Sequence, residues 1–87
     1  MHESAMMKGL LKQITVAAKS HRAARVASVR VALGALSNIT PAHLNEHFVE
    51  AAQGTIAEGA TLDITCSEDI ADPHAQDIMI LSVEVAQ

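Results

Sequence analysis

The chain begins Met1-His2-Glu3, a run that places several metal-binding groups side by side. The α-amine of Met1, the amide nitrogen of His2 and the His2 imidazole can close fused small rings around one metal ion, and Glu3 can add its amide or its carboxylate. Nitrogen donors in a plane suit Ni(II) and Cu(II), which accept square-planar geometry. The donors must lose protons to bind, so the affinity should rise with pH. An ordinary frayed chain end is the alternative.

His43 and His47, with Glu46 between them, are a second group of candidate ligands. The spacing matches the H-x-x-E-H pattern of some zinc proteases, and residues four apart share one face of a helix. The chain is too short to supply a protease cleft and a third ligand at a defined place. Two solvated surface histidines are the simpler interpretation, and a zinc hydrolase is an alternative that predicts zinc retention on purification.

The composition limits both the core and the cellular setting. The 87 residues make at most one domain, and Phe48 is the only aromatic residue, so the core must be mainly aliphatic. The single cysteine, Cys66, excludes an internal disulfide and a cysteine-rich zinc site. We expect a buried thiol in a reduced, cytoplasmic protein. No signal peptide is recognisable, and no apolar run approaches the roughly 20 residues of a membrane span.

The charges are unevenly distributed along the chain. The net charge of −4 argues against nucleic acid as a partner. All 6 Lys and Arg residues lie between Lys8 and Arg30, whereas all but one of the 10 Asp and Glu residues lie between Glu46 and Glu84. This separation favours a basic face for an acidic partner, with ordinary solvated faces as the alternative.

Residues 4–20 are predicted to form an amphipathic helix with Ser4 as its N-cap, because apolar residues recur at helical spacing. The apolar positions are Met7, Leu10, Leu11, Ile14, Ala17 and Ala18. The opposite stripe is Lys8, Lys12, Thr15 and Lys19. The three lysines are therefore candidates for contact with a partner protein.

The remaining segments predict one further helix and three strands. Thr40 and Pro41 suit the cap and first position of a helix that ends at Gly54, and Leu44, Phe48, Ala51 and Ala52 form its buried stripe. Alternation of β-branched residues predicts strands at 25–33, 60–66 and 77–85, with Met79, Leu81, Val83 and Val85 on one face of the last.

The order helix-strand-helix-strand-strand favours an α+β fold with two helices packed on one face of a three-stranded mixed sheet. An acidic loop, 67–76, joins the last two strands. The thin core and the apolar last strand favour self-association through an open sheet edge, so a homodimer is one expected assembly.

Several stretches occur together in an order that carries a family resemblance. They are "MHE" at the start, "RVASVRVALGALSNITPAHL" at 25–44, "GTIAEGATLDI" at 54–64 and "DIMILSVEV" at 77–85. Over almost the whole chain the sequence resembles the HypA/HybF family of hydrogenase nickel-incorporation proteins.

The resemblance implies a function that is not enzymatic. It implies a nickel metallochaperone for [NiFe] hydrogenase maturation that binds Ni(II) through Met1, His2 and Glu3 and works with a maturation GTPase and the hydrogenase large-subunit precursor. It also implicates the first helix in partner contact, which suits Lys8, Lys12 and Lys19. The alternative is a metal-independent module that docks the GTPase or a hydrogenase subunit through this helix.

The chain departs from the family pattern in three places. The family carries two Cys-x-x-Cys motifs that form a zinc site between the last two strands, and here loop 67–76 stands in their place. We therefore expect residues 1–87 to be a single nickel-binding-type domain without structural zinc. The other departures are "GAL" at 34–36, where the family usually has Glu in the middle, and the histidines at 43 and 47.

Overall fold

The structure is a computed structural model that describes residues 2–86, with side chains described from Ala5 to Ala86. Met1, the first predicted nickel ligand, lies outside the described residues, and only the backbone is described for His2 and Glu3. The elements are α1 (His2–Ser20), β1 (Arg25–Leu33), α2 (Pro41–Ala52), β2 (Thr61–Cys66) and β3 (Ile78–Ala86). Their order confirms the predicted one.

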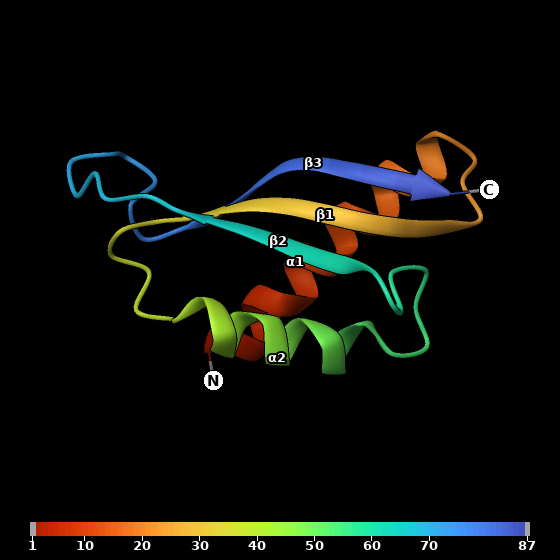
Figure 1. Ribbon diagram of the computed structural model, residues 1–87, viewed down its shortest axis with the longest axis horizontal. Helices are drawn as coiled ribbons and strands as arrows, with labels where there is room; N and C mark the ends of the chain where they lie inside the picture. The colour runs from red at the N-terminus through yellow and green to blue at the C-terminus, as the bar shows by residue number, and fades with distance from the viewer. Residues whose placement is uncertain (1, 87) are drawn as a thin grey trace.

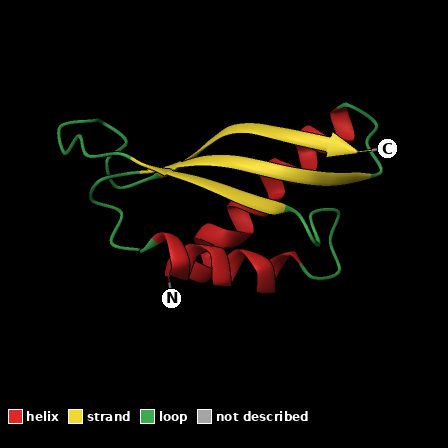
Figure 2. Cartoon of the chain, viewed as in Figure 1, coloured by secondary structure: helices red, strands yellow, loops and turns green. Residues whose placement is uncertain are grey.

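The strands form one mixed sheet in the order β2-β1-β3. β1 lies in the centre, pairs in parallel with β2 and pairs antiparallel with β3. A parallel neighbour requires a crossover connection, which α2 supplies. Both helices lie on the same face of the sheet (Figures 1 and 2), as predicted, and β2 and β3 form its two edges.

The core lies between this sheet face and the two helices. The buried residues of α1 are Met7, Leu10, Ile14 and Ala18, those of β1 are Val26, Val29, Val31 and Leu33, and those of α2 are Leu44, Phe48 and Ala52. The predicted stripe of α2 is confirmed apart from Ala51, which is exposed. The buried positions of α2 recur every fourth residue, which makes the buried face narrow and places Ala51 outside it.

The ends of the two helices agree only in part with the capping residues predicted from the sequence. The backbone N–H of His43 donates a hydrogen bond of 3.1 Å to Thr40 Oγ1, which confirms Thr40 as the N-cap of α2. α2 ends one residue earlier than predicted, because its C-cap is Gln53 with an extended backbone, and Gly54 follows with a φ of 79°, a left-handed conformation that glycine adopts readily. The prediction of Ser4 as an N-cap is wrong, because α1 already begins at His2 and Ser4 lies inside the helix.

β3 does not place its apolar residues on one face as predicted. Val83 and Val85 pack against the core together with Ile78 and Ile80, whereas Met79 and Leu81 are 41% and 54% exposed. The cause is a register irregularity: Arg30 pairs with Ser82 and Val31 with Ile80, so Leu81 has no partner on β1. An extra residue of this kind is a β-bulge, which reverses the alternation of side chains along the strand.

Cys66 is exposed, which contradicts the prediction of a buried thiol. It is the last residue of edge strand β2 and lines a hollow of about 360 Å³ between β2 and the chain that leads into α2. Leu62 and Ile64, which share the alternation with Cys66, are half-buried against the core, whereas Cys66 at the end of the strand is exposed.

Candidate metal centre

Two of the predicted nickel residues, His2 and Glu3, are the first residues of α1. Because the helix begins at His2, the backbone N–H groups of His2 and Glu3 belong to the first turn, where N–H groups have no partner within the helix. These amide nitrogens are therefore available to a ligand without the loss of a helical hydrogen bond.

The start of α1 lies in a crowded part of the molecule. α1 packs against α2, and its first turns lie beside α2 in Figure 1. On another side, a hollow of about 510 Å³ separates the first half of α1 from the chain that enters β3; Ala5, Met6 and Gly9 line one wall, and His74 and Asp77 are part of the other. The backbone of His2 and Glu3 lies within one helical turn of Ala5, the first residue of this wall.

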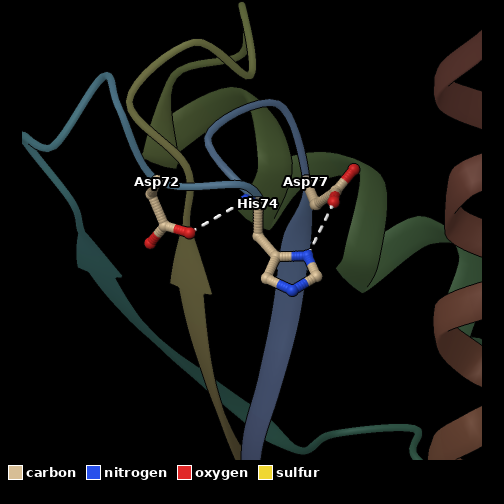
Figure 3. Close-up of polar contacts among 3 residues, drawn as sticks. All are labelled: Asp72, His74 and Asp77. Carbon is tan, nitrogen blue, oxygen red and sulfur yellow. Dashed lines mark hydrogen bonds and ion pairs between the residues drawn. The ribbon is translucent and has the colours of Figure 1, made fainter.

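A histidine that the sequence analysis did not identify lines this hollow. His74 Nδ1 lies 3.1 Å from Asp77 Oδ2, and the backbone N–H of His74 donates a hydrogen bond of 2.8 Å to Asp72 Oδ1 (Figure 3). A carboxylate on one ring nitrogen orients the imidazole and directs its other nitrogen outward, as at many metal sites. The spacing Asp-x-His-x-x-Asp in the acidic loop is the signal that could have identified this group.

His43 and His47 are in direct contact on α2. Their Nε2 atoms lie 2.7 Å apart, and their rings are nearly parallel, with an interplanar angle of 9°. The expected sharing of one helix face is therefore confirmed. Within the part of the chain whose side chains are described, no group of three or more His, Cys, Asp or Glu residues could hold a metal ion. The zinc-hydrolase alternative thus gains no third ligand from these residues.

The three lysines of α1 lie on the solvent-exposed side of the helix, as their spacing in the sequence predicted. Lys8, Lys12 and Lys19 are exposed, on the side of the helix opposite its buried residues. Lys19 lies in the last turn, where a cation complements the helix dipole. The stripe is thus accessible to a partner protein. No helix among residues 2–86 is long and apolar enough to cross a membrane.

The chain matches a known class of metallochaperones over most of its length. Residues 1–72 match the family model for hydrogenase/urease nickel-incorporation metallochaperones. The chain belongs to the HypA family, which confirms the resemblance seen in the sequence. The family is one of hydrogenase maturation factors, and this role places it with the hydrogenase maturation machinery.

Individual relatives support this assignment. The hydrogenase maturation factor HypA of Desulfitobacterium hafniense is 34% identical over 83 residues, which cover 84% of this chain and 73% of the relative. HypA of Archaeoglobus fulgidus is 40% identical over 65 residues, which span 75% of this chain and 59% of the relative. The solution structure of the Ni metallochaperone HypA from Helicobacter pylori superposes with a TM-score of 0.77 over 97% of each chain at 15% identity, a likeness of fold.

Proposed function

We propose that this protein is an accessory protein of [NiFe] hydrogenase maturation that binds Ni(II) through Met1, His2 and Glu3. The observation that carries the proposal is the start of α1 at His2 in a chain of the HypA family. In this proposal residues 1–87 act as one domain, loop 67–76 replaces the family's zinc insertion, and no structural zinc is needed. The partners are the hydrogenase large-subunit precursor and a maturation GTPase.

The helix start explains how such a site would gain its donors. A planar nickel complex takes the deprotonated amide nitrogen of His2 as a ligand, and that nitrogen then carries negative charge. The positive end of the helix dipole stabilises negative charge within the first turn. Because this amide has no hydrogen-bond partner within the helix, its deprotonation breaks none of the helical hydrogen bonds.

We expect His2→Ala to weaken the tightest Ni(II) binding by at least about 100-fold, since loss of a ligand should exceed the 10–100-fold effect of losing an outer-shell partner. Nickel titration of protein with a native, unblocked terminus would measure this, alongside an N-terminally acetylated form. Only the native protein should give the visible absorption band of a diamagnetic planar complex. His21→Ala, at an exposed histidine beyond α1, is the control. Equal affinity in all forms would exclude the site.

A second candidate function follows from the exposed stripe of Lys8, Lys12 and Lys19. The protein would then act as a metal-independent module that holds an acidic surface of the GTPase or a hydrogenase subunit through α1. Summed charge of one sign on a helix face speeds encounter with a surface of opposite charge.

We expect the double variant Lys8→Glu/Lys12→Glu to reduce capture of the maturation GTPase in a pull-down by an order of magnitude or so at low salt, because the reversed charges repel an acidic surface. His2→Ala is the matched variant, since it leaves the lysine stripe unchanged. Hydrogenase activity that depends on the lysines but not on His2 would favour the docking module over the nickel site. Undiminished capture would remove α1 as the docking surface.

A further inference from the structure

We propose that His43 and His47 on α2 form a second metal site that binds a divalent first-row transition-metal ion through both Nε2 atoms. This inference goes beyond the proposed function, because it concerns a different helix and different ligands. Imidazole nitrogen suits Ni(II), Cu(II) and Zn(II), and two histidines four residues apart on a helix are a known arrangement for chelating such an ion.

The separation of the two nitrogens fits one shared ion. At metal–nitrogen distances of about 2.0–2.1 Å, two ligands at a right angle lie about 2.9 Å apart, and the observed Nε2···Nε2 distance is 2.7 Å. The ring centroids are 4.6 Å apart, so the rings approach each other through their Nε2 edges. A shift of a few tenths of an ångström, within ordinary side-chain freedom, brings both nitrogens to bonding distance of one ion.

A metal ion bound by both rings would replace the hydrogen bond between their Nε2 atoms. When both rings are neutral, one Nε2–H donates to the other Nε2. An ion bound by both Nε2 atoms requires the hydrogen of each ring on Nδ1, so the donating ring changes tautomer through solvent. The number of protons on the neutral pair stays the same, and the ion takes the position of the hydrogen bond.

The surroundings of the two histidines are accessible to solvent and carry negative charge, which favours a cation. His43 is exposed, so a hydrated ion can reach it. Glu46 and Glu50 line a shallow hollow of about 120 Å³ with His47 and place negative charge beside it. Among the side chains that the structure describes, no third His, Cys, Asp or Glu joins the pair. α2 packs against α1, so this site lies in the same helical layer as the first one.

Nickel titration in a His2→Ala background tests this site independently of the N-terminal one. We expect that background to retain one saturable equivalent of Ni(II), and His43→Gln or His47→Gln to abolish it, because a single imidazole does not chelate. Glutamine is at least as good a helix former as histidine, so α2 should persist. His21→Gln, at an exposed histidine outside α2, is the control and should retain the equivalent.

Thermal unfolding provides a readout that needs no hydrogenase. An ion that bridges successive turns of α2 stabilises the folded state, and at free Ni(II) about five times its Kd the Tm should rise by about 4–8 °C. The rise should vanish in His47→Gln. No saturable binding in the His2→Ala background, or binding that survives loss of both histidines, would overturn the second site. A single equivalent lost equally in His2→Ala and His47→Gln would mean one shared site and would also overturn it.

Discussion

Phe48→Ala should lower the free energy of unfolding by about 3–5 kcal/mol, the range for truncation of a buried aromatic residue. Phe48 is 1% exposed and packs between α2 and the sheet in a core that is otherwise aliphatic. A domain of this size has a total stability on the order of 4–13 kcal/mol. The loss is therefore a large fraction of the total, and the variant should be partly unfolded at physiological temperature.

Urea denaturation followed by circular dichroism would measure the effect of Phe48→Ala. The matched control is Val49→Ala, the next residue of the same helix, whose side chain is 51% exposed. It should change stability by no more than about 0.5 kcal/mol, as surface substitutions usually do. A Phe48→Ala loss as small as that of the control would show that α2 does not anchor the core.

Gly34→Ala should destabilise the protein by about 1–3 kcal/mol, the usual range for overpacking. A Cβ at Gly34 would overlap the backbone carbonyl of Ala75 and lie 2.7 Å from the carbonyl oxygen of His74. The surrounding hydrogen bonds leave little room for adjustment: the Gly34 N–H donates to the Asp77 carbonyl at 2.9 Å, and the Leu36 N–H donates to the Ala75 carbonyl at 2.7 Å. The added methyl group must push the loop away from the end of β1.

Gly9→Ala is a control of opposite sign. Gly9 lies within α1, and a Cβ there would meet no atom within 4 Å, so the substitution should stabilise the protein by about 0.5–1 kcal/mol. Paired Tm measurements would show one variant below and the other above the parent. Amide hydrogen exchange should speed up at Leu36 in Gly34→Ala only. Equal Tm values for the two variants would contradict the close approach of the loop to β1.

The loop that Gly34 holds is also the segment that we expect to stand in place of the family's zinc site. Its attachment to β1 fixes His74 and Asp77 at the wall of the hollow beside α1. Displacement of the loop in Gly34→Ala would therefore reach the surroundings of the proposed nickel site. This link makes Gly34→Ala informative about the site as well as about stability.

Local signals in the sequence were sufficient for the order of the helices and strands and for the family. The strand predicted at 25–33 matches β1 (Arg25–Leu33), and Thr40-Pro41 located the start of α2. These signals depend on residues a few positions apart, because side-chain spacing and capping are properties of one segment. The short "MHE" motif and the body that follows it likewise indicated the nickel-incorporation family before any contact was known, and the family model confirms that assignment.

Features that depend on contacts between segments were not predictable in the same way. The bulge at Leu81 arises from the pairing of β3 with β1, and the exposure of Cys66 follows from its place at the end of an edge strand. The position of His74 at the hollow beside α1 depends on the packing of its loop against β1.

The sequence by itself determined the order of the elements, the N-cap of α2, the basic stripe of α1 and the membership of a nickel-handling family. Only the tertiary structure decided which strand positions are buried, how closely the His43 and His47 rings approach each other and what lies beside the start of α1. The physical reason is that local spacing fixes the direction of a side chain relative to its own backbone. Its burial and its neighbours depend on segments that are distant in the chain and meet only when the sheet and the helices pack together.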